Sequence, residues 1–182
     1  MRLILLLTFM VAILNADKNM DNILSFYESG KHKKVCVDGL KLFNRGYKNE
    51  QFLSIIGDSC AKTDSIYALS QLQNSLIKTE QGRMNASYFA TLVLQKKLIY
   101  QFFVDNLDLG YLVLPKTGHI LSIVFDSIVT KKYKILSKMP KKIEFTRDGK
   151  KIIVYIDDRR DTKKVIVKIY AGKKLVKAHS YW

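Results

Sequence analysis

Two cysteines, Cys36 and Cys60, are the side chains of this sequence with the clearest chemistry. Apolar spacing predicts a helix over 33–44 and another over 51–62, and position 48, midway between the cysteines, lies in their connection. Residues equidistant from the turn of an antiparallel helix pair lie at the same height, so both thiols are expected on facing sides of one hairpin. The spacing predicts a disulfide between them, with two buried free thiols as the alternative.

The histidines do not suggest a catalytic set. His32, His119 and His179 are far from one another and from the cysteines in the sequence, and each is expected at the surface. Because no zinc-ligand spacing surrounds the cysteines, we predict no metal site, no cofactor and no catalytic residues. The protein is therefore expected not to be an enzyme, unless folding brings a histidine, an acid and a nucleophile together.

Clustered carboxylates in the C-terminal third are a further possible cation site. Asp157, Asp158 and Asp161 lie close together, but Arg159 and Arg160 interrupt them. The glycine and the distal glutamate of a calcium-binding loop are missing from this segment. We interpret it as a charge-compensated turn.

Basic residues are concentrated at the C-terminal end of a chain with net charge +15. Residues 131–182 hold seventeen Lys and Arg against five Asp and Glu, whereas residues 17–130 hold thirteen against eleven. Such a segment attracts anionic partners, and a merely solubilising face is the alternative. The lysines predicted to share the polar face of a C-terminal sheet, and so to form a face for an anionic ligand, are Lys142, Lys151, Lys168 and Lys177.

The N-terminus, residues 1–16, has the order of a secretory signal peptide. Arg2 precedes the apolar run from Leu3 to Leu14, and the small residue Ala16 is suited to the end of the segment. Twelve apolar residues are too few for a bilayer core of roughly 30 Å, which needs about 20. We expect cleavage near Ala16 and a periplasmic or secreted protein, with an uncleaved anchor or a buried first helix as alternatives because Leu14 is large for its position.

The apolar pattern predicts an α+β fold in two domains. Residues 17–130 show helical spacing and are expected to form antiparallel helical hairpins. In residues 131–182 apolar residues alternate, which predicts a small four-stranded antiparallel β-meander with a hairpin turn at Asp148-Gly149. So small a sheet needs its apolar face covered, and the last predicted helix, 117–130, is the expected cover.

The consecutive hairpins of residues 20–83 resemble the tetratricopeptide class of α-solenoids. The residues that carry the similarity are Tyr27 with the turn 30–32, and then Ile56, Gly57, Cys60 and Ala68. The sequence departs from the repeat in lacking its later proline and in placing the alanine one position early, so a generic stack of hairpins is the alternative. The resemblance implies a protein-binding concave surface and identifies no partner.

Two binding functions follow from these patterns. The first is an exported, periplasmic, non-enzymatic protein-interaction or scaffold module that contacts another envelope protein through its hairpins. The alternative is a binder of anionic envelope polymer, lipid or glycan, or of a membrane surface, through the basic sheet. Nucleic acid is not expected as a partner outside the cytoplasm, and the sequence predicts no oligomeric state.

Overall fold

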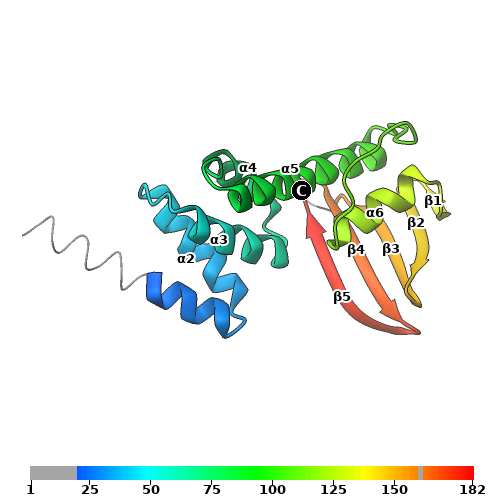
Figure 1. Cartoon of the computed structure of the whole chain (residues 1–182). Coiled ribbons are helices and arrows are strands. Elements are labelled where there is room, and N and C mark those ends of the chain that lie inside the picture. Colours follow the sequence, from blue (N-terminus) through cyan, green and yellow to red (C-terminus); the bar gives the residue numbers. More distant parts are fainter. Residues whose placement is uncertain (1–19, 160–161) are drawn as a thin grey trace, which may run out of the picture. The chain divides into compact units, whose positions relative to one another are not determined.

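Helices come first along the chain and strands follow, as Figure 1 shows for a computed structural model of the protein. The structure describes residues 20–159 and 162–182. The predicted signal peptide, residues 1–16, lies outside the described residues. The α+β class expected from the change of apolar period is therefore confirmed.

Short polar side chains begin several of the helices. Asn49 caps α3, because its side chain accepts a hydrogen bond of 3.0 Å from the backbone N–H of Phe52. His119 caps α6 in the same way, its ring Nδ1 accepting from the N–H of Leu121. Helical residues 20–28 are followed by α2 (His32–Asn44), α3 (Glu50–Lys62), α4 (Ile66–Leu72), the 3₁₀ turn η1 (Gln73–Ser75), α5 (Glu80–Val104) and α6 (Ile120–Val129).

The chain divides into two compact units between Asn85 and Ala86. The predicted domains, 17–130 and 131–182, stay a prediction. The compact unit that holds the sheet also holds α6 and α5 from Ala86 onward. A physical reason is that the apolar face of the sheet cannot face water and is covered by helices of the same unit. We call the described residues 20–85 the N-terminal unit and residues 86–182 the C-terminal unit.

The N-terminal unit is built on an antiparallel hairpin of α2 and α3. A disulfide joins Cys36 to Cys60, with a Cα–Cα distance of 4.9 Å, and confirms the predicted pairing. One helical turn further on, Gly39 lies so close to Ile56 that a Cβ atom at Gly39 would meet the isoleucine side chain at 2.4 Å. The two helices therefore lie in direct backbone-to-side-chain contact beside the disulfide.

Glu50, at the start of α3, forms the main polar contact within the N-terminal unit. Its buried carboxylate accepts hydrogen bonds from the backbone N–H groups of Ile77, Lys78 and Thr79, and from the hydroxyl of Thr79 at 2.6 Å. These three residues immediately precede α5. Glu50 therefore fixes the approach of the chain to that helix.

The sheet of the C-terminal unit has five strands, not the four that we predicted. They form an antiparallel meander in the order of the sequence: β1 (Lys134–Lys138), β2 (Lys141–Arg147), β3 (Lys150–Asp157), β4 (Lys164–Ala171) and β5 (Lys174–Tyr181). The additional strand is β1. It was missed because none of its side chains is buried, so no alternation of buried and exposed residues marks it.

One face of this sheet, which we call the inner face, packs against helices. Its buried residues include Ile143, Ile152, Val154, Val165 and Val167. Contacts that tie helices to the sheet region include a hydrogen bond of 2.7 Å from Lys141 Nζ to the carbonyl oxygen of Phe102 and ring contacts of Phe102 with Tyr133 and of His119 with Tyr181. Figure 1 shows α6 alongside the strands, as expected for the last helix before the sheet.

None of the helices in the described part of the chain is both long and apolar enough to cross a membrane.

Candidate functional site

The outer face of the sheet, opposite to the inner face, carries three of the four lysines predicted to bind an anionic ligand. Lys142 of β2 pairs with Tyr155 across the strands, and Lys151 of β3 pairs with Tyr170. Lys168 lies two residues before Tyr170 on β4. Paired residues, and residues two apart on one strand, share a face, so these five side chains lie on the same side of the sheet.

Lys177, the fourth predicted lysine, lies on the inner face. A regular β4–β5 hairpin would pair it with Lys168, but the register shifts so that Lys177 pairs with Ile169. The extra residue in β5 is Val176, which has no partner in the ladder. Because the side-chain period of a strand is two, one inserted residue turns every later side chain to the other face. The prediction for Lys177 was therefore wrong about its face.

The tyrosines of the outer face were not predicted as part of the site. The ammonium groups of Lys142 and Lys168 each lie 5.6 Å from the centre of the Tyr155 ring. Lys151 lies 5.5 Å from the centre of the Tyr170 ring. These distances are in the range of cation–π contacts, which hold a lysine over a ring without neutralising its charge. The signal in the sequence was that Tyr155 and Tyr170 stand at even spacing from Lys151 and Lys168.

Acidic side chains only partly compensate the outer face. The carboxylate of Glu144 lies 3.8 Å from the ammonium nitrogen of Lys151. Because both side chains are partly exposed, solvent screens this ion pair. Asp157 is held by Arg159 through two guanidinium contacts of 2.8 Å. Within residues 20–159 and 162–182, no ion pair involves Lys142 or Lys168. The charge of these two lysines is therefore available to a ligand.

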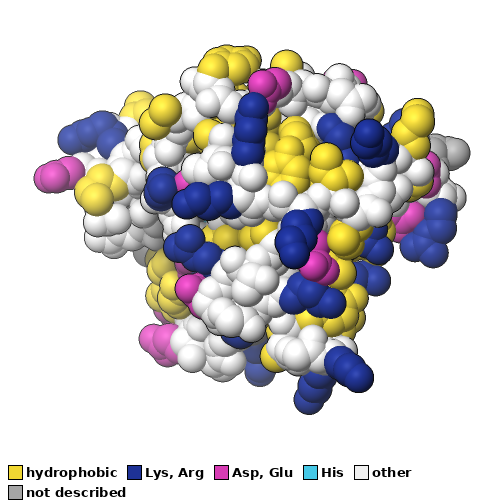
Figure 2. All heavy atoms as spheres, turned by 90° about the vertical axis from the view of Figure 1, so that its right-hand side faces the viewer, with side chains coloured by type: hydrophobic (Ala, Val, Ile, Leu, Met, Phe, Trp, Pro, Cys, Tyr) yellow, Lys and Arg dark blue, Asp and Glu magenta, His cyan; other side chains and the backbone are white. Residues whose placement is uncertain are grey.

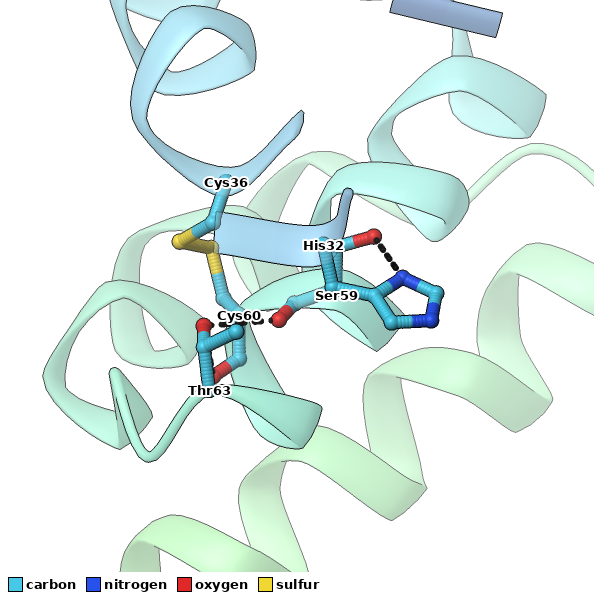
Figure 3. The surroundings of a disulfide bond; sticks show 5 residues. All are labelled: His32, Cys36, Ser59, Cys60 and Thr63. Carbon is cyan, nitrogen blue, oxygen red and sulfur yellow. Dashed lines mark hydrogen bonds between the residues drawn. A yellow bond between two sulfur atoms is a disulfide. The ribbon is translucent and has the colours of Figure 1, made fainter. Parts of the chain in front are cut away.

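The surroundings of the disulfide contain a serine–histidine pair, which Figure 3 shows. The ring Nδ1 of His32 lies 3.2 Å from the hydroxyl of Ser59, and the hydroxyl of Thr63 donates to the carbonyl oxygen of Ser59 at 2.8 Å. Such a pair can serve as nucleophile and base in hydrolases. Here Ser59 is completely buried, so its hydroxyl cannot reach a substrate in this structure. The pair links the start of α2 to α3 beside the disulfide.

The other two histidines meet at one tyrosine in the C-terminal unit. The rings of His119 and His179 lie 6.4 Å and 6.1 Å from that of Tyr181. We expected surface positions, but only 6% of His179 is exposed. The reason is again the shift in β5, which turns His179 and Tyr181 to the inner face. The buried rings of His179 and Tyr181 fill the core where strand β5 meets the start of α6, and the half-buried ring of His119 lies at its border.

Asp157, one of the carboxylates clustered around the β3–β4 connection, forms an ion pair within the segment. Asp157 binds Arg159, as expected for a charge-compensated turn, whereas Arg160 and Asp161 lie outside the described residues. In the two described ranges no three His, Cys, Asp or Glu side chains are arranged to hold a metal ion.

Comparison with models of protein families, with curated proteins and with solved structures finds no match to this chain.

Proposed function

We propose that this protein is an exported, non-enzymatic binding module whose outer sheet face holds an anionic macromolecule. The observation that carries the proposal is the alignment of Lys142, Lys151 and Lys168 with two tyrosines on one face of the sheet. The predicted signal peptide supports a site of action outside the cytoplasm. There, phosphorylated or acidic glycans are the polyanions that fit best.

The pattern of the outer face suits an extended polymer more than a small ion. Lysines of three neighbouring strands can each contact a different anionic group, since strands lie about 4.8 Å apart. Tyr155 and Tyr170 offer flat, half-buried rings between these charges, on which a sugar ring can pack. Because the lysines are spread over the face and not gathered around one cavity, the affinity should depend on several weak contacts.

Replacing Lys168 by glutamine should weaken polyanion binding, whereas replacing Lys177 by glutamine should not. Both lysines are in the same sheet and the two changes remove the same charge, but Lys177 lies on the inner face. We expect the affinity for heparin or polyphosphate to fall about fivefold for Lys168→Gln, equivalent to about 1 kcal/mol. The slope of log affinity against log salt should fall by about one.

Fluorescence anisotropy with labelled heparin, over a series of salt concentrations, measures both effects. Equal losses for the two variants would mean that binding follows net charge alone and would refute the outer face as the site. Absence of binding by the wild-type protein, even at low salt, would do the same.

We further propose that the N-terminal unit contacts another envelope protein, as the tetratricopeptide resemblance implies. A specific observation favours this: a hollow of about 330 Å³ beside α2 combines the apolar side chains of Phe26 and Leu42 with Lys34, Lys41 and Arg45. Such a hollow suits a segment with both apolar and acidic side chains. Asp38, which pairs with Lys41, lines it as well.

Changing Lys34 and Arg45 to glutamate should abolish capture of an acidic partner from periplasmic extract. The tagged full-length chain would be isolated from the periplasm, crosslinked and analysed by mass spectrometry. The control carries the same charge change at Lys33 and Lys48, which are exposed and do not line the hollow. Equal capture by the two variants would contradict this contact, and recovery of the chain only from the cytoplasm would contradict export.

A further inference from the structure

A second basic surface lies at the end of the sheet where β1 turns into β2. Residues 134–141, which we call the basic hairpin, form β1, its turn and the first residue of β2, and they contain no acidic residue. The lysines of the basic hairpin are Lys134, Lys138 and Lys141. Lysines on an edge strand commonly prevent aggregation, which alone would account for the charges.

The basic hairpin also exposes apolar side chains. Protection of an edge strand against aggregation does not explain their exposure. Met139, in the turn, is 92% exposed, and Ile135 and Leu136 are 56% and 47% exposed. Figure 2 looks onto the side of the molecule where β1 and β2 lie and shows hydrophobic side chains between basic ones. A soluble polyanion would interact with the lysines but would leave these apolar side chains in water.

A hollow of about 300 Å³ lies next to the turn. Its charged lining consists of Lys138, Lys141 and Lys163, with Asp158 as an acidic neighbour. Its apolar lining includes Phe103 and Ile156. The ammonium group of Lys141 is already fixed, because it donates to the carbonyl oxygen of Phe102 and lies 4.1 Å from the centre of that ring.

The meander places these features together at one end of the sheet. The β1–β2 turn and the β3–β4 connection lie at the same end, because antiparallel strands reverse at each turn. The turns at 148–149 and 172–173 lie at the opposite end. Exposed Lys138, Met139 and Lys163 therefore mark one end, and exposed Lys150 and Lys173 mark the other.

We propose that the basic hairpin docks the protein on an anionic phospholipid bilayer. Met139 enters the interfacial layer, the lysines contact lipid phosphates, and the hollow beside the turn receives one phosphate head group. The combination of exposed apolar and basic side chains is what a bilayer surface binds and a soluble polyanion does not fully use. This inference does not depend on the outer face, which is a different surface of the unit.

The matched pair of double variants K138E/K163E and K150E/K173E tests the position of the site. Both change the charge equally, at opposite ends of the same sheet. With the full chain and sedimented vesicles of phosphatidylcholine with phosphatidylglycerol, K138E/K163E should weaken binding at least 25-fold, about fivefold per lysine. K150E/K173E should weaken it by less than about threefold, because distant charges are screened by salt. Vesicles of phosphatidylcholine alone should not bind.

Met139→Asn tests insertion separately from charge. Because Met139 is almost fully exposed, the variant should fold normally, which its thermal unfolding would verify. We expect about tenfold weaker vesicle binding, since burial of a methionine side chain is lost, and unchanged heparin binding. Lys168→Gln should show the reverse, with weaker heparin binding and unchanged vesicle binding. Equal losses for the two double variants, or vesicle binding unaffected by Met139→Asn, would overturn the bilayer proposal and leave the outer face untouched.

Discussion

Replacing Cys36 and Cys60 together by alanine should lower the free energy of unfolding by about 3 kcal/mol. The disulfide spans 24 residues of sequence and restricts the unfolded chain by closing a loop of that length. Urea unfolding followed by circular dichroism measures the change. Because alanine keeps most of the buried volume of these small side chains, the loss should come mainly from the missing crosslink.

Reduction of the wild-type protein provides the internal control. Dithiothreitol should destabilise the wild type by about as much as the double substitution does, and it should not affect the variant. Titration of free thiols in the denatured, unreduced protein should find none. A protein with two titratable thiols and no response to reductant would contradict the disulfide.

The disulfide also bears on where the protein acts. Structural disulfides persist in oxidising compartments and are rare in the cytosol. The crosslink therefore supports the proposed export independently of the N-terminal sequence. Expression in a host that lacks periplasmic disulfide oxidation should lower the yield of the folded N-terminal unit.

Features governed by local periodicity were predictable from the sequence. The disulfide followed from the helical period and from the position of the turn between α2 and α3. The α+β class followed from the change to a period of two, and Asp148-Gly149 forms the β2–β3 turn with positive φ at both residues. In each case the residues within a few positions of one another determine the structure.

Features that depend on the pairing register between neighbouring strands were not predictable. Val176 is an ordinary strand residue, and nothing near it in the sequence indicates that it lacks a partner in the ladder. Its insertion moved Lys177 to the inner face and buried His179. The strand β1 depends entirely on β2 for its pairing, since burial gives it no pattern of its own.

The division of the C-terminal lysines between two binding surfaces was not predictable from the sequence either. The sequence indicated that the C-terminal third is basic, but it did not separate its lysines into two surfaces. Register places Lys142, Lys151 and Lys168 beside tyrosines on the outer face, whereas the turn after β1 exposes Met139 at one end of the sheet. The turn of the second surface presents an almost fully exposed methionine beside its lysines, so the two surfaces are expected to bind different ligands.

Glu50→Gln should destabilise the N-terminal unit at neutral pH, although nothing in the sequence distinguishes Glu50 from any acid in a first helical turn. Three successive backbone N–H groups before α5 converge on its carboxylate and form a small anion-binding nest. Gln carries no charge, and its amide nitrogen cannot accept a hydrogen bond. We expect a clear fall in Tm, whereas Glu80→Gln, which changes an exposed acid in α5, should leave Tm almost unchanged.

The pH dependence of stability gives a sharper test of the same contact. The Thr79 hydroxyl, and then the N–H groups of residues 77–79, outweigh the effect of burial and lower the pKa of Glu50 from 4.5 to about 2. A carboxyl group with a depressed pKa stabilises the fold above its unfolded value, and this contribution is lost as the pH falls toward the folded value. Wild-type stability should therefore decline between pH 4.5 and about 2 more steeply than that of Glu50→Gln.

Gly82→Ala tests the hydrogen bonds that Glu50 accepts without changing any charge. A Cβ atom at Gly82 would meet the Glu50 carboxylate oxygen at 2.5 Å and the Thr79 hydroxyl at 2.8 Å. The variant keeps every charge but must displace the carboxylate, so its stability should show the same flattened response to acid as Glu50→Gln. If both variants kept the wild-type acid response, the stabilising interaction would not be the one between Glu50 and the residues before α5.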